Sequence, residues 1–156
     1  MNTILTRQLL DAFHEAAGID ALMPPLPEGM TSQYVHVIDA IAQIEEKKGA
    51  VRVSDVAECL HVSIPGITRS LRALEALGAV EKKKNAGDRR VVHVALTALG
   101  QTWYQVYVEE YHKRLSALLS DIPDGEAAVT AATIAKVIGR MREHPILLRE
   151  ERRTDR

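Results

Sequence analysis

The sequence has a single cysteine, Cys59, one phenylalanine and one tryptophan among its 156 residues. One cysteine excludes an intrachain disulfide framework and a zinc site built from cysteines, which is typical of a reducing compartment. No apolar run reaches about 18 uninterrupted residues, the length that a membrane-spanning helix requires. Residues 1–13 intersperse polar side chains among apolar ones, unlike the apolar core of a signal peptide. We therefore expect a soluble, cytoplasmic protein with no membrane partner.

Hydrophobic residues make up 46% of the chain, enough for one buried core. Because aromatic residues are scarce and Ala and Leu recur at helical spacing, the composition favours a mainly α fold. A first helix is predicted over residues 3–17, followed by a proline-rich connector at 23–29. A second helix should begin near Thr31 or Ser32 and end at residues 47–49. Its predicted buried side chains are Val37, Ile38, Ile41 and Ile44.

Charge is distributed unevenly, although the whole chain carries only −1. Residues 47–90 carry ten basic and five acidic side chains, a net +5, which leaves −6 for the remainder. Such asymmetry is typical of a phosphate-binding lobe joined to a part that does not bind phosphate. The alternative is an ordinary solvated charged surface.

Two short helices in close succession predict a helix-turn-helix. Ser54 is a suitable N-cap for a helix over residues 55–60, and Ser63 for a helix over residues 64–77. The turn contains His61, a residue type that tolerates positive φ. On the second helix, the side chains expected to face inward are Ile64, Ile67, Leu71 and Leu74. The opposite face comprises Pro65, Arg69, Arg72 and Ala76, so its arginines could enter the major groove of DNA.

A β-hairpin wing should follow, because the hydrophobic period changes to two after Gly78. Its strands are predicted at residues 80–83 and 91–96. Lys82, Lys83 and Lys84 suit backbone phosphates, while Asp88 could orient Arg89 or Arg90 for insertion into the minor groove.

Helices are predicted again beyond Thr97. The first is long, with one face formed by Trp103, Tyr107, Tyr111, Leu115 and Leu118. A last helix after Pro123 carries Ile134, Ile138 and Met141. The terminal helices have apolar stripes that the small central lobe cannot cover, so a second copy of the chain is a reasonable partner.

The segment from Val53 to Gly100 resembles the multiple-antibiotic-resistance regulator (MarR) family. The similarity lies in Ser63–Arg69 (SIPGITR), Leu74–Gly78 (LEALG), Gly87–Arg90 (GDRR) and Leu96–Gly100 (LTALG). It implies a winged helix-turn-helix joined to a helical dimerisation domain, with the first and the last two helices of two protomers interleaved. It further implies binding to double-stranded DNA at a pseudo-palindromic operator and repression that a ligand or oxidation relieves.

These considerations divide the chain into residues 1–30 (dimerisation helix and connector), 31–97 (DNA-binding domain), 98–148 (dimerisation helices) and 149–156 (charged tail). The expected DNA-binding residues are Ser63, Pro65, Gly66, Thr68, Arg69, Arg72, Lys82, Lys83, Lys84, Asp88, Arg89 and Arg90. Family effector pockets tend to lie between the winged lobe and the dimer helices. Candidates for lining a site for a small aromatic acid are Phe13, His14, Tyr34, His36, Trp103, Tyr104 and Tyr107. The alternative is that these side chains serve core and dimer packing.

Other functions have weaker support in the sequence. No metal or cofactor is expected, since none of the six histidines forms a His-x-x-x-His pair. Cys59 is expected to be a buried structural cysteine rather than a redox switch. An enzyme is not expected either, because Cys59 and His61 lack a third catalytic member and no phosphate-binding glycine loop is present. The remaining alternative is a winged-helix module that binds another protein instead of DNA.

Overall fold

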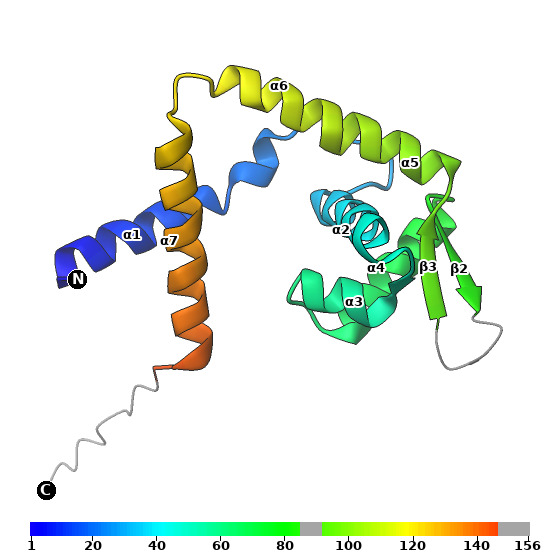
Figure 1. The fold of residues 1–156 in the computed structure, drawn as a ribbon, viewed down its shortest axis with the longest axis horizontal. Coiled ribbons are helices and arrows are strands. Elements are labelled where there is room, and N and C mark those ends of the chain that lie inside the picture. Colours follow the sequence, from blue (N-terminus) through cyan, green and yellow to red (C-terminus); the bar gives the residue numbers. More distant parts are fainter. Residues whose placement is uncertain (85–91, 147–156) are drawn as a thin grey trace, which may run out of the picture. The chain divides into compact units, whose positions relative to one another are not determined.

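The computed structural model describes residues 1–84 and 92–146 and divides the chain into two compact units, residues 1–113 and 114–156. The first unit contains α1 (Thr3–Ala16), η1 (a 3₁₀ turn, Ile19–Leu22), α2 (Ser32–Lys48), β1 (Val51–Arg52), α3 (Val53–Cys59), α4 (Ile64–Ala76), β2 (Val80–Lys84), β3 (Val92–Leu96), α5 (Ala98–Tyr104) and the π-helical segment η2 (Gln105–Glu110) (Figure 1). Helix α6 (Tyr111–Leu118) spans the boundary, and α7 (Asp124–Glu143) lies in the second unit. The predicted fold class, mainly α with a small wing, is confirmed.

Helix α2 forms where its sequence predicts it. The Thr31 hydroxyl oxygen accepts a hydrogen bond from the Tyr34 N–H at 3.3 Å and caps the first turn. Gly49 ends the helix with φ 73°, a conformation that glycine adopts without steric cost. The four predicted apolar side chains are all buried, so helical spacing correctly identified the inner face of α2.

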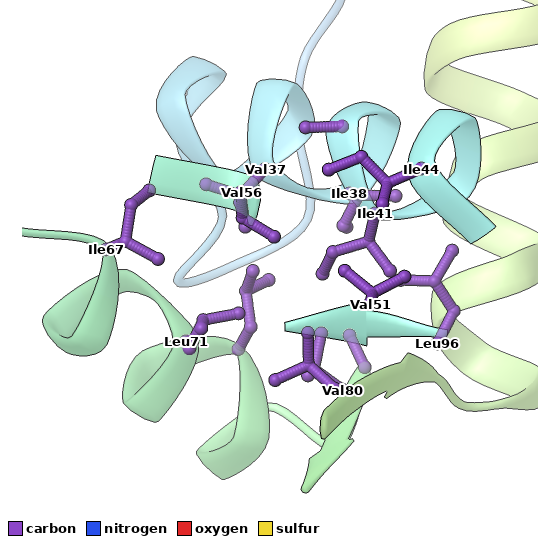
Figure 2. Packing of buried hydrophobic residues seen from close by; sticks show 14 of the residues in the cluster. Val37, Ile38, Ile41, Ile44, Val51, Val56, Ile67, Leu71, Val80 and Leu96 are labelled. Carbon is purple, nitrogen blue, oxygen red and sulfur yellow. The ribbon is translucent and has the colours of Figure 1, made fainter. Parts of the chain in front are cut away.

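One hydrophobic core joins α2 to the helices and strands that follow it (Figure 2). Its largest fully buried side chains are Val37, Ile38, Ile41, Val51, Val56, Ile67, Leu71 and Leu74. Burying a side chain of this size contributes about 1.5–3 kcal/mol. This core holds α4 on a scaffold made mainly by the segment from α2 to β3, with Met30 and Val108 added from outside it.

The sheet has three antiparallel strands in the order β1-β3-β2. Val51 pairs with Val94, and Lys82 pairs with the other side of Val94. Strand β1 was not predicted, because two residues are too few to display a period of two. It forms only because β3, more than 40 residues later, supplies its hydrogen-bonding partner.

Helix α3 begins earlier than predicted, and Ser54 is not its N-cap. Arg52 occupies the cap position, and its N–H donates to the Asp55 carboxylate at 3.0 Å. This hydrogen bond, with the Lys48 ammonium at 3.1 Å, holds the pKa of Asp55 below its usual value against the opposing effect of burial. An acid in the third helical position therefore decides where α3 begins.

The end of α4 and the start of α5 share one tightly packed joint. The Thr97 hydroxyl donates to the Gly78 carbonyl at 2.6 Å and accepts from the Gly100 N–H at 3.2 Å. A Cβ at Gly100 would overlap the Ala79 carbonyl, so only glycine lets these backbones approach this closely. The joint fixes the first turn of α5 to the segment that leaves α4.

The prediction of a single long helix after Thr97 is wrong in one respect, because the π-helical segment η2 separates α5 from α6. A π-helical turn contains an extra residue, so it alters which side chains share a face. Val108, inside η2, is buried, whereas Leu118 is 75% exposed and leaves the predicted stripe. Apolar spacing alone does not reveal such an insertion.

Helices α1 and α7 each have an apolar side but no buried residue among those described. On α1 the exposed large hydrophobic side chains are Ile4, Leu5 and Leu10. On α7 they are Val129, Ile134, Ile138 and Met141. The need for a partner, expected from the sequence, therefore persists in each unit taken by itself.

Candidate nucleic-acid interface

Helices α3 and α4 form the expected helix-turn-helix. His61 adopts φ 52°, the positive value that its residue type predicted for the turn. The Val62 N–H donates to the Ala57 carbonyl at 3.0 Å, and the His61 N–H donates to the Glu58 carbonyl at 3.1 Å. These bonds close the turn against the end of α3 and set the direction in which α4 starts.

The first turn of α4 is capped as predicted. The Ser63 hydroxyl oxygen accepts from the Gly66 N–H at 3.3 Å, and Pro65 occupies a position where a missing N–H costs nothing. The Thr68 hydroxyl donates to the Ile64 carbonyl at 2.8 Å. The positive end of the helix dipole at this turn favours a negatively charged partner.

Opposite faces of α4 have opposite character. Ile67, Leu71 and Leu74 are fully buried, whereas Arg69 and Arg72 are exposed, as the helical period predicted. Within residues 1–84 and 92–146, neither guanidinium has an ion-pair partner, so both charges are available to an incoming anion. Ile64 is 55% exposed, and the prediction that it faces inward is wrong. It lies in the first turn, beyond the edge of the packed core.

Two of the wing lysines, Lys82 and Lys83, form ion pairs within the lobe. The Lys82 ammonium lies 2.6 Å from the Glu75 carboxylate on α4, and the Lys83 ammonium lies 2.7 Å from Glu81. The Glu81 hydrogen bond raises the pKa of Lys83. Sequence reasoning missed these acidic partners, although the two-residue period of β2 places Lys82 on the same side as buried Val80, toward α4.

Part of the predicted wing contact cannot be placed. Asp88, Arg89 and Arg90 lie outside the described residues, as does the side chain of Lys84. Their proposed roles in the minor groove and at phosphates stay predictions.

The aromatic candidates for an effector site fall into two groups. Tyr34, Trp103, Tyr104 and Tyr107 are half-buried and pack against the hydrophobic core, from α2 on one side and from α5 and η2 on the other. Burial raises the pKa of Tyr104, with smaller contributions from Glu109, Asp39 and Glu46.

The other three candidates are peripheral to this cluster. Phe13 is half-buried on α1, while His14 and His36 are exposed. His36 lies 3.9 Å from Asp20, whose carboxylate also accepts a 2.8 Å hydrogen bond from the Ser32 hydroxyl. The structure therefore brings four of the seven side chains to one core.

Cys59 is exposed, so the prediction of a buried cysteine is wrong. It is the last residue of α3, whose inner face is supplied by Val56 and Ala57. Among the described residues, no three His, Cys, Asp or Glu side chains gather in a way that could hold a metal ion. In the same ranges, no helix combines the length and apolarity needed to cross a bilayer.

Comparison with known proteins gives consistent results. Residues 28–91 match the sequence model of the MarR family. The chain is 26% identical over 117 residues to the HTH-type transcriptional repressor MdtR of Bacillus subtilis (strain 168), an alignment covering 74% of this chain and 76% of MdtR.

Solved structures share the fold. Streptococcus pneumoniae FabT, crystallised in complex with DNA, has a TM-score of 0.65 at 23% identity and covers 89% of this chain and 96% of FabT. Bordetella bronchiseptica BpsR, whose DNA binding is regulated by 6-hydroxynicotinic acid, has a TM-score of 0.64 at 18% identity, covering 85% of this chain and 97% of BpsR. At these identities the likeness establishes a common fold.

Proposed function

Because this chain belongs to the MarR family of transcriptional regulators, we propose that it binds double-stranded DNA as a homodimeric repressor at a pseudo-palindromic operator. The observation that carries the proposal is the exposed face of α4. This face carries Arg69 and Arg72, which have no ion-pair partner among the described residues, and the opposite face of the helix is buried in the core. An α-helix fits the major groove, and a guanidinium can bond both acceptors on a guanine edge.

The remaining interface residues extend this contact. We place the first turn of α4, with Ser63, Pro65, Gly66 and Thr68, against the DNA, and assign phosphate contacts to Lys83 and Lys84. Lys82 can add a phosphate contact when it is released from Glu75. Asp88, Arg89 and Arg90 are assigned to the minor groove at the wing tip. The DNA-binding domain is residues 31–97.

The dimer follows from the uncovered apolar surfaces of the flanking segments, residues 1–30 and 98–148. Side chains such as Leu5, Ile134 and Ile138 are exposed in a single chain, and exposed apolar surface of this extent favours burial against a second copy. Two-fold symmetry of the dimer then requires half-sites about one helical turn apart. The protein acts through occupancy of cytoplasmic DNA and needs no catalytic activity.

An effector of this repressor is a small aromatic acid. The supporting observation is that Tyr34, Trp103, Tyr104 and Tyr107 are half-buried and all pack against the same hydrophobic core, Tyr34 from α2 and the other three from α5 and η2. BpsR, which shares the fold, responds to such an acid. A ligand held there contacts both the scaffold of α4 and the helix that leads away from the lobe.

The direct test is selection of binding sites from a random duplex library, followed by fluorescence anisotropy titrations over a range of salt. We expect a symmetric site and an affinity that falls steeply with salt. Arg69→Ala and Arg72→Ala should each weaken binding at least tenfold, because a good bidentate contact contributes about 1–3 kcal/mol and the dimer loses two of them.

Lys136→Ala is the matched control, since it removes one positive charge from the side of α7 opposite Ile134. Sedimentation should show a dimer for all variants. A monomer that enriches no duplex at low salt would refute the proposal and favour a module that binds another protein.

A further inference from the structure

Ile64 is the one residue of the expected inner row of α4 that the core does not cover. Ile67, Leu71 and Leu74 are fully buried, but Ile64 is 55% exposed at the first position of the helix. Exposing a large β-branched side chain there gives nothing to the packing of the lobe. Its position, at the end of α4 that precedes the exposed arginines, makes it available to whatever α4 contacts.

The neighbourhood of Ile64 offers apolar surface rather than hydrogen-bond donors. Helical geometry places Ile64 about 40° around the axis from Thr68 and about 80° from Arg72, beside the exposed face. Pro65 has no N–H, and the Gly66 N–H is already bonded to the Ser63 hydroxyl. The Thr68 hydroxyl has its hydrogen committed to the Ile64 carbonyl. Apart from the Ser63 hydroxyl, this turn therefore lacks side-chain donors of the kind that Arg69 and Arg72 provide further along.

The major groove presents one apolar group, the C5-methyl of thymine. The N-terminal residues of a recognition helix are the ones that reach base edges. We propose that Ile64 contacts a thymine methyl group in each half-site and so specifies thymine at that position. This inference rests on the proposed DNA-binding function and adds a base identity to it.

The test replaces thymine by deoxyuridine, which removes only the methyl group. Each thymine of the selected duplex is replaced in turn, in both half-sites, and affinities are measured for the wild-type dimer and for Ile64→Ala. At one position per half-site, wild-type affinity should fall about fourfold, or about 15-fold for both, because burial of one such group contributes about 0.8 kcal/mol and 1.4 kcal/mol is tenfold. Ile64→Ala should bind the thymine and uracil duplexes equally, whereas Ile64→Val should retain discrimination.

Val62→Ala is the matched control, because Val62 is also apolar and 41% exposed but precedes the cap of α4. It should leave the thymine-to-uracil ratio unchanged. The inference is overturned if no thymine in the selected site is sensitive to loss of its methyl, or if Ile64→Ala still discriminates. These results leave DNA binding intact, whereas failure of the wild-type protein to enrich any duplex refutes the proposed function as well. Thermal unfolding of each variant verifies that the fold is unchanged.

Discussion

The ion pair between Lys82 and Glu75 leads to a prediction about how many lysines the wing offers to DNA phosphates. The ammonium and carboxylate are 2.6 Å apart, and their side chains are 25% and 44% exposed. While Glu75 holds it, Lys82 is not free to contact a phosphate. Replacement of Glu75 by glutamine should therefore release Lys82 and increase DNA affinity at low salt.

The size of this effect follows from counterion release. Each phosphate neutralised on B-DNA steepens the slope of log affinity against log salt by about 0.9, so two released lysines in a dimer add about 1.8. Between about 50 and 200 mM salt, this slope corresponds to an additional loss of about 12-fold in affinity. The cost in folding should stay below about 1 kcal/mol, because partly exposed ion pairs contribute little.

The assay is a double-mutant cycle measured by anisotropy across that salt range. Lys82→Ala should change the slope little in the wild-type background but remove the added slope in Glu75→Gln. Glu143→Gln provides the control, because Glu143 pairs with Arg140 at 3.8 Å on α7, a helix that supplies none of the proposed DNA contacts. If Lys82→Ala has the same effect in both backgrounds, Glu75 does not withhold Lys82 and the reasoning is wrong.

Two further predictions concern stability. Gly100→Ala should lower the free energy of unfolding by about 3 kcal/mol in urea titrations, because its Cβ would overlap the Ala79 carbonyl. Gly139→Ala is the control, and it should be neutral or stabilising because a Cβ at this position of α7 meets open space. Equal effects of the two substitutions would contradict the close backbone approach at Gly100. The pKa of Asp55 is lowered in the folded state, so its contribution is present above the unfolded pKa and disappears as pH falls below about 4. Asp55→Asn should therefore be less stable at neutral pH and show a flatter loss of stability in acid, and an unchanged acid limb would argue against this role.

The parts of the fold that sequence alone predicted depend on local interactions. The cap at Thr31, the left-handed Gly49, the cap at Ser63 and the positive φ of His61 each involve residues within a turn of one another. Helical spacing identified the buried side of α2 because all of that helix lies over the core.

The predictions were wrong or incomplete where the local structure depends on residues far away in the sequence or on competing local interactions. Strand β1 needs β3 as a partner, and the pair Lys82–Glu75 joins a strand to a helix. At the start of α3, Ser54 was predicted as the cap, but the Asp55 carboxylate bonds the Arg52 N–H and the helix begins earlier. Ile64 has the correct period for the core but stands where the core ends.

The candidate interface was anticipated in its arginines but not in its acidic partners. Arg69 and Arg72 are exposed as their period predicted. The pair of Lys82 and Glu75 joins β2 to α4, so neither segment alone reveals it, whereas Glu81 and Lys83 lie two residues apart on one side of β2. Residues 85–91 fall outside the described ranges, and the wing-tip assignment is tested by measuring the DNA affinity of Arg90→Ala. Loss of affinity without loss of the dimer would support it.

The joint at Thr97 and Gly100 has a mechanical implication. The backbones of α5 and of the segment that follows α4 are in direct contact, with no side chain between them. A tilt of α5 must therefore move that segment as well. A winged lobe built in this way should move with α5 as a rigid body. In a dimer, a small rotation of α5 would then change the distance between the two lobes without changing the structure of either.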